Sequence, residues 1–138
     1  MGLFKHEWPY YPVILFSNSQ ILKLPMIWHK IAESEQSINW QPNHMCLVEA
    51  GDKKVTIAQF NGQLFAFAHK CPHASGIMAD GCINPAGQVT CPLHRYRFDM
   101  KNGRNTSGEG YYLKTYAIEK REDGIYVGWE DKGFWVSL

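Results

Sequence analysis

Two short Cys/His motifs constrain this chain more than any other feature of its sequence. Cys71-Pro72-His73 is followed, after residues 74–90, by Cys91-Pro92-Leu93-His94. Thiolates and imidazoles together suit zinc or an iron–sulfur centre. We therefore expect a fold that holds two separate loops, both rich in Gly and Pro, face to face.

Each motif carries one Cys and one His, and this mixture bears on the kind of metal. Zinc fingers usually pair Cys with Cys in one knuckle and His with His in another. The mixed arrangement suits a two-metal cluster, in which both cysteines bind one iron and both histidines bind the other. A structural zinc site in an interaction domain stays the alternative, with the same four ligands: Cys71, His73, Cys91 and His94.

Alternating apolar and polar residues before the first motif predict a hairpin. Val55 and Ile57 share one face of a strand over 53–60, and 63–70 alternates again. Asn61-Gly62 between them is a favoured two-residue turn. The first Cys/His motif follows this hairpin directly.

The second half of the chain is also predicted to be β-structure. Residues 113–121 and 125–130 flank Asp123-Gly124 and predict another hairpin, and 89–93 and 96–100 are short strand candidates. We find no long amphipathic helix and no internal repeat. Short strands separated by turns predict an all-β fold, a small antiparallel sandwich or barrel.

Length, charge and apolar runs limit the class of protein. A chain of 138 residues suffices for one domain, and a net charge of +1 with mixed signs gives no reason to expect nucleic acid or an anionic membrane as partner. The apolar run 12–16 is too short to span a bilayer. We expect a cytoplasmic protein with reduced cysteines and no membrane partner.

The first 25 residues differ from the rest of the chain. They contain aromatics and prolines but no sustained period of 2 or 3.6 residues. We predict a poorly ordered N-terminal extension over 1–25 and a single domain over 26–138. The alternative is an arm that packs on the domain through Trp8, Tyr10 and Tyr11.

"CPHASG" followed by "CPLHRYRFD" resembles the Rieske [2Fe–2S] family, whose pattern is Cys-x-His, a short interval, then Cys-x-x-His. The resemblance covers roughly residues 45–130. It implies a Rieske-type fold, with a β base and a cluster-binding subdomain made of the two loops. It also implies one [2Fe–2S] cluster, held by Cys71 and Cys91 on the inner iron and by His73 and His94 on the outer iron.

Departures from the high-potential members indicate the low-potential, soluble branch of the family. Those members carry a second cysteine in each loop, where this chain has Gly76 and Leu93. They also carry a Ser and a Tyr where this chain has Tyr96 and Phe98. With fewer hydrogen bonds to sulfur, we expect a potential of roughly −150 mV rather than +300 mV.

Several further expectations concern residues around the loops. Gly76 and Gly81 are expected to let backbone N–H groups approach the cluster sulfurs. Cys46 and Cys82 match nothing in the family pattern and are expected to be ordinary buried cysteines. The loop 102–110 is expected to shield one side of the cluster. The expected docking face lies around the remaining exposed edge: His73, His94, Ile77 and Leu93.

The resemblance implies a one-electron carrier rather than an enzyme in its own right, because no catalytic constellation stands beside the cluster. The expected role is a ferredoxin that passes electrons from a flavin-dependent reductase to a terminal oxygenase or similar redox enzyme. The alternative is a small accessory subunit of an assimilatory nitrite reductase-like complex. "LKTYAIEKREDGIYV" resembles the C-terminal strands of such subunits.

Overall fold

The computed structural model describes residues 24–108 and 110–132. The predicted extension 1–25 lies outside these residues except for its last two, and the arm through Trp8, Tyr10 and Tyr11 lies wholly outside them. Residues 29–127 form one unit, which contains both Cys/His motifs. The remaining described residues belong to a second unit, in which the Asp131 N–H donates to the Pro25 carbonyl at 2.7 Å.

The all-β prediction is confirmed. The described residues form strands and two short 3₁₀ helices, with no α-helix among them. Every strand pair whose register is defined is antiparallel. The strands are β1 (Met26–Ala32), β2 (Met45–Ala50), β3 (Lys53–Phe60), β4 (Gln63–Ala68), β5 (Cys82–Ile83), β6 (Gln88–Thr90), β7 (Arg97–Asp99), β8 (Thr115–Arg121) and β9 (Gly124–Glu130).

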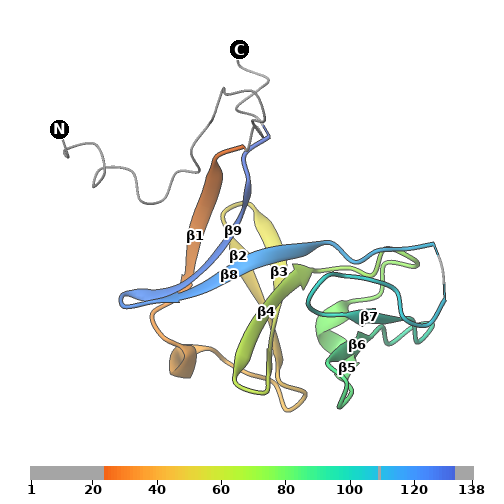
Figure 1. Ribbon diagram of the computed structural model, residues 1–138. Coiled ribbons are helices and arrows are strands. Elements are labelled where there is room, and N and C mark those ends of the chain that lie inside the picture. The colour runs from red at the N-terminus through yellow and green to blue at the C-terminus, as the bar shows by residue number, and fades with distance from the viewer. Residues whose placement is uncertain (1–23, 109, 133–138) are drawn as a thin grey trace. The chain divides into compact units, whose positions relative to one another are not determined.

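The larger sheet has the strand order β1-β9-β8-β4-β3-β2 and forms the base (Figure 1). Its central hairpin turns at Asn61 and Gly62, which both have positive φ (51° and 76°), and Phe60 pairs with Gln63. This is the turn predicted from the Asn-Gly pair. Residues 55–58 are all buried, so β3 is covered on both faces and not only on the predicted one.

The smaller sheet, β5-β6-β7, lies to the right in Figure 1. Its strands are shorter than the predicted 89–93 and 96–100, because the backbone leaves the sheet at Cys91 to form a loop. Val89 and Phe98 face each other across β6 and β7 and are fully buried. This apolar pair anchors the loop that carries the second Cys/His motif.

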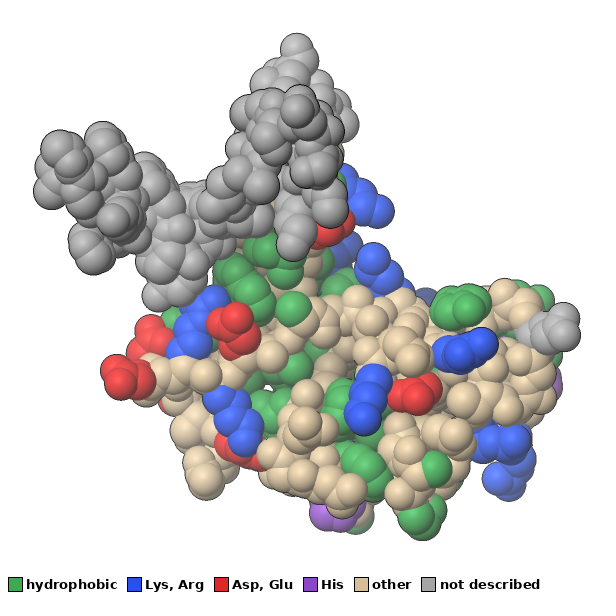
Figure 2. Space-filling view, viewed as in Figure 1, with side chains coloured by type: hydrophobic (Ala, Val, Ile, Leu, Met, Phe, Trp, Pro, Cys, Tyr) green, Lys and Arg blue, Asp and Glu red, His purple; other side chains and the backbone are tan. Residues whose placement is uncertain are grey.

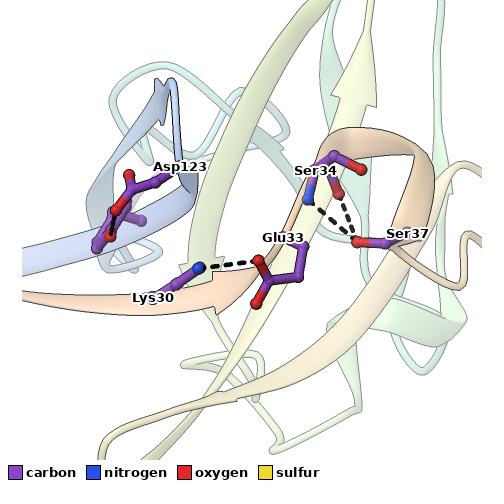
Figure 3. Close-up of polar contacts among 6 residues, drawn as sticks. Lys30, Glu33, Ser34, Ser37 and Asp123 are labelled. Atoms are coloured by element: carbon purple, nitrogen blue, oxygen red, sulfur yellow. Dashed lines mark hydrogen bonds and ion pairs between the residues drawn. The ribbon is translucent and has the colours of Figure 1, made fainter.

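The 3₁₀ helix η2 (Glu35–Ser37) follows β1. The Ser37 hydroxyl donates to the Ser34 carbonyl at 2.8 Å and accepts from the Ser34 N–H at 3.2 Å (Figure 3). This turn places the Glu35 carboxylate 2.8 Å from Nζ of Lys120 on β8 and 2.6 Å from Nε2 of Gln59 on β3. One carboxylate thereby links η2 to two strands of the base.

In the part of the chain that the structure describes, no helix has both the length and the apolar character needed to cross a bilayer.

Candidate metal centre

Both Cys/His motifs lie in six-residue loops that share one backbone design. The first, 71–76, is closed by the pairing of Lys70 with Ile77, and the second, 91–96, by the pairing of Thr90 with Arg97. The loops therefore start and end at equivalent positions, 20 residues apart in the sequence. This likeness is not visible as a repeat in the sequence, because the two loops share little beyond Cys-Pro.

The same two hydrogen bonds hold each loop. In the first loop, the Cys71 N–H donates to the Gly76 carbonyl at 2.8 Å, and the Ser75 N–H donates to the Cys71 carbonyl at 3.0 Å. In the second, the Cys91 N–H donates to the Tyr96 carbonyl at 2.8 Å, and the Arg95 N–H donates to the Cys91 carbonyl at 3.1 Å.

Each loop also turns through one left-handed residue at the same position. Ser75 has φ 60° and Arg95 has φ 61°. L-residues adopt this region at a cost, so the loop hydrogen bonds must hold it in place. The backbone of each loop is thus fixed before any metal is considered.

The two thiols are buried in the core. Cys71 is 2% exposed and Cys91 is 1% exposed, within a cluster that includes Phe67, Met78 and Phe98. Burial raises the pKa of the Cys71 thiol, although the N–H groups of His73 and Ala74 donate to its sulfur and oppose that rise. The Cys91 thiol is within hydrogen-bonding reach of Cys71 and raises its pKa further. The two sulfurs therefore lie side by side, and a metal would replace their protons.

The two imidazoles are less buried than the thiols. Their ring centroids are 4.8 Å apart and their planes are at 80°. His94 is exposed, whereas His73 is half-buried and its Nδ1 is buried with no hydrogen-bond partner among the described residues. An unpartnered buried nitrogen is costly, so this atom fits a role as a metal ligand.

Two tyrosines surround His73. The Tyr96 ring stacks on the imidazole with centroids 4.2 Å apart, and the Tyr111 ring meets it at 5.1 Å and 65°. The loop 102–110 runs beside β7, where the Thr106 N–H donates to the Arg97 carbonyl. Tyr111, one residue beyond the predicted shielding loop, is one of the two side chains that pack on His73, and sequence reasoning missed it.

The two glycines expected to admit N–H groups to the sulfurs have different roles in the structure. A Cβ on Gly76 would lie 2.8 Å from Sγ of Cys91, so the loop needs Gly there to leave room at the sulfurs. The Gly81 N–H instead donates to the Met78 carbonyl, which closes the 3₁₀ helix η3 (Met78–Asp80). Sulfur-directed N–H groups come from His73 and Ala74.

Two amide side chains connect the base to the first loop. Asn43 Nδ2 donates to the carbonyls of Ala79 (2.8 Å) and Gly81 (2.9 Å), and Gln41 Nε2 also donates to Ala79 at 2.8 Å. The Met78 N–H donates to the His69 carbonyl at 3.0 Å. These bonds hold η3, and with it the end of the first loop, against the segment before β2. Contacts between residues so far apart in the chain leave no local sequence signal.

The prediction that Cys46 and Cys82 are buried is wrong. Cys82 is exposed, because β5 is a two-residue edge strand and its first side chain points to solvent. Cys46 is half-buried on β2, where its thiol lies 3.6 Å from the Leu47 carbonyl. Neither residue lies in the two loops.

The donor set fits a two-iron cluster better than one zinc ion. Among the described residues, no three His, Cys, Asp or Glu side chains converge as the ligands of a single ion. Structural zinc needs four ligands around one point, whereas each iron of a His₂Cys₂ cluster takes only two from the protein. Two neighbouring buried sulfurs and two neighbouring imidazoles supply these pairs.

Comparison with known proteins agrees with this arrangement. Residues 27–117 match the model of the Rieske [2Fe-2S] domain. The nitrite reductase [NAD(P)H] of Emericella nidulans is 27% identical over 132 residues, which cover 75% of this chain and 12% of that protein. The 3-phenylpropionate/cinnamic acid dioxygenase ferredoxin subunit of Photorhabdus laumondii is 26% identical, covering 53% of this chain and 70% of that subunit. The chain thus spans about an eighth of the first relative and most of the second.

Solved structures share the fold. The nitrite reductase small subunit of Mycobacterium tuberculosis aligns with a TM-score of 0.67 at 17% identity, over 77% of this chain and 97% of that one. A chain in the complex of reduced oxygenase and oxidized ferredoxin of carbazole 1,9a-dioxygenase aligns with a TM-score of 0.64 at 23% identity, over 77% of this chain and 96% of that one.

Proposed function

The chain belongs to the Rieske [2Fe–2S] domain family, and from this premise we propose that it is a ferredoxin-like carrier of single electrons. In this proposal Cys71 and Cys91 bind one iron of the cluster, and His73 and His94 bind the other. The electrons come from a flavin-dependent reductase and go to a terminal oxygenase or a similar redox enzyme.

The observation that carries the proposal is the layering of the ligands. Two thiols less than 3% exposed lie in the core, whereas the His94 imidazole is exposed. The side chains that would hold the cluster thus range from the buried core to the surface. This is the arrangement a carrier needs, because it combines protection from solvent with a short path to a partner.

Bound in this site, the cluster would supply reversible one-electron oxidation and reduction. The chain's own residues control its surroundings. The N–H groups of His73 and Ala74 donate to the Cys71 sulfur and stabilise negative charge there. Tyr96 and Tyr111 pack against the ring of His73 and restrict its orientation.

The partner classes are proposed from the relatives. One relative is the ferredoxin subunit of a dioxygenase, and one structural neighbour was solved with its oxygenase. We place the carrier in the cytoplasm, where the four free cysteines of this chain would stay reduced.

A second candidate is a small subunit of a nitrite reductase-like complex. It is favoured by the extent of the match to the nitrite reductase of Emericella nidulans, which covers 75% of this chain, against 53% for the dioxygenase ferredoxin subunit. The two candidates share the cluster and differ in the acceptor.

Iron analysis and low-temperature EPR of the purified full chain test the proposal. We expect two irons per chain, a rhombic signal after reduction with dithionite, and its loss on reoxidation. Zinc without iron would overturn it. Reduction by NADH with a ferredoxin reductase, followed by electron delivery to an oxygenase, supports the first candidate. Stable co-purification with a nitrite reductase catalytic subunit supports the second.

A further inference from the structure

Charge is unevenly distributed between the two parts of the chain. Residues 69–114, which include both loops and the smaller sheet, contain six Lys and Arg against three Asp and Glu, a formal charge of +3. The other described residues, 24–68 and 115–132, contain six Lys and Arg against nine Asp and Glu, a formal charge of −3. The near-neutral total therefore conceals a basic segment around the candidate metal centre.

Exposed apolar side chains gather at the same segment. Four large hydrophobic residues are exposed in the described part of the chain, and three of them lie here: Leu93 at 57%, Tyr111 at 41% and Tyr112 at 66%. Leu93 is adjacent to His94, and Tyr111 packs against His73. Tyr112 lines the same surface hollow as Tyr111, so exposed apolar side chains accompany both imidazoles, and we call these three residues the apolar centre.

The same segment carries three exposed arginines. Arg95 follows His94 in the second loop, and Arg97 begins β7. Arg104 lines a surface hollow of about 200 Å³ together with Tyr111 and Tyr112. None of the ion pairs found among the described residues involves these arginines. Figure 2 shows Lys and Arg side chains outnumbering acidic ones at the right of the view, over the smaller sheet and its loops.

We propose that this surface docks a redox partner protein whose own docking face is lined with carboxylates. We call it the arginine-rimmed face: Leu93, Tyr111 and Tyr112 with Arg95, Arg97 and Arg104. The proposal rests on the proposed function, and it adds the sign of the partner's charge. Arg and Tyr are enriched in protein interfaces, and a charged rim around an apolar centre raises the encounter rate of complementary partners.

Other anionic ligands fit this surface less well. Nucleic acid and anionic membranes bind through dense, one-signed charge, and this segment carries only +3 spread over 46 residues, with Asp80 and Asp99 among them. Large apolar side chains at the centre of the face suit the desolvated core of a protein interface.

Electron transfer to probes of opposite charge tests the proposal without the natural partner. Dithionite-reduced full-length holoprotein is mixed by stopped flow with ferricyanide or hexaammineruthenium(III), and with acidic cytochrome b5 or basic cytochrome c, at rising ionic strength. The variant is Arg97→Gln/Arg104→Gln. The control, Lys30→Gln/Lys54→Gln, removes the same charge from the base.

We expect the rates of the wild type with ferricyanide and cytochrome b5 to fall as salt rises. At low salt, the arginine variant should react with these two probes about fivefold more slowly than the wild type. The rates with hexaammineruthenium(III) and cytochrome c should rise as salt rises, and at low salt they should be higher in the arginine variant than in the wild type. The control should change each rate less than about twofold, because its lysines lie outside the segment 69–114 that carries the imidazoles and the proposed face. Equal effects of the two variants, or faster transfer to cytochrome c at low salt, would overturn the proposal.

Two further results separate the possible failures. A normal [2Fe–2S] EPR signal with no dependence on probe charge overturns the docking face and leaves the carrier function standing. Absence of the cluster overturns both. Tight binding of phosphatidylserine vesicles or of a 20-nucleotide single-stranded RNA, lost in the arginine variant, would assign the face to that ligand and overturn the protein partner.

Discussion

The ring of Tyr96 lies nearly parallel to the imidazole of His73, with centroids 4.2 Å apart and planes at 13°. His94, the other imidazole, is exposed. The two candidate histidine ligands are therefore not equivalent, since one is fixed by aromatic packing and the other faces solvent. His94 is the imidazole better placed to pass an electron to a partner.

We expect Tyr96→Leu to lower iron occupancy and broaden the EPR signal, because the His73 ring loses its stacked neighbour. Aromatic pairs contribute about 0.5–1.5 kcal/mol beyond the area they bury. Tyr96→Phe keeps the ring and should retain full occupancy. Equal iron loss in both variants would show that the hydroxyl, not the stack, matters.

The ligand assignment predicts a clear division among the cysteines and histidines. Cys91→Ser and His94→Ala should each abolish the EPR signal, because each removes one of four ligands. Cys46→Ser and Cys82→Ser should keep the cluster, because both residues lie outside the two loops. Iron loss in Cys82→Ser but not in Cys91→Ser would contradict the assignment. Circular dichroism of each variant separates ligand loss from unfolding.

Gly76→Ala should prevent cluster assembly while leaving the base folded. The added methyl group would lie 2.8 Å from Sγ of Cys91 and 3.1 Å from Cγ of Leu93, and the sulfur cannot move without leaving the site. Gly108→Ala is the matched control, since no atom lies within 4 Å of its Cβ position. Iron content and visible absorption of the two variants provide the comparison.

Asn43→Asp should loosen the first loop, because a carboxylate cannot donate to the carbonyls of Ala79 and Gly81. Two lost hydrogen bonds correspond to about 1–3 kcal/mol. We expect a lower urea midpoint and faster cluster loss on warming. Gln63→Ala, at the exposed first position of β4, serves as control and should leave both unchanged.

Glu35 predicts a specific response to acid. Hydrogen bonds from Lys120 and then Gln59 hold the pKa of its carboxyl below its ordinary value. These bonds stabilise the fold fully when the pH is above the ordinary pKa of a Glu carboxyl. The stabilisation is lost as the pH falls through the lower pKa that the group has in the folded protein. The stability difference between wild type and Glu35→Gln should therefore be constant at neutral pH and shrink in acid. Urea unfolding at several pH values measures it, and a pH-independent difference would contradict the assignment.

The features predicted correctly from sequence depend on neighbouring residues. Asn61-Gly62 specifies a tight turn by itself, and the hairpin forms where predicted. The spacing of Cys71, His73, Cys91 and His94 indicated both the family and the facing loops. In each case, the information is contained in a few consecutive positions.

The features that were missed depend on tertiary contacts. Tyr111 reaches His73 from a different loop, and Asn43 holds Ala79 from 36 residues away. Cys82 was expected inside because free cysteines usually are, but the two-residue strand β5 leaves it at an edge. No local pattern distinguishes these outcomes.

The matching loops 71–76 and 91–96 also determine how the site can be assembled. Each closes within six residues through its own hydrogen bonds and its own left-handed residue, so each can form early and independently during folding. The long-range steps are the docking of one finished loop against the other and the anchoring of η3 by Gln41 and Asn43. An incoming cluster would then meet two prepared half-sites, and most of the entropy cost of ordering the ligands would already have been met by the polypeptide.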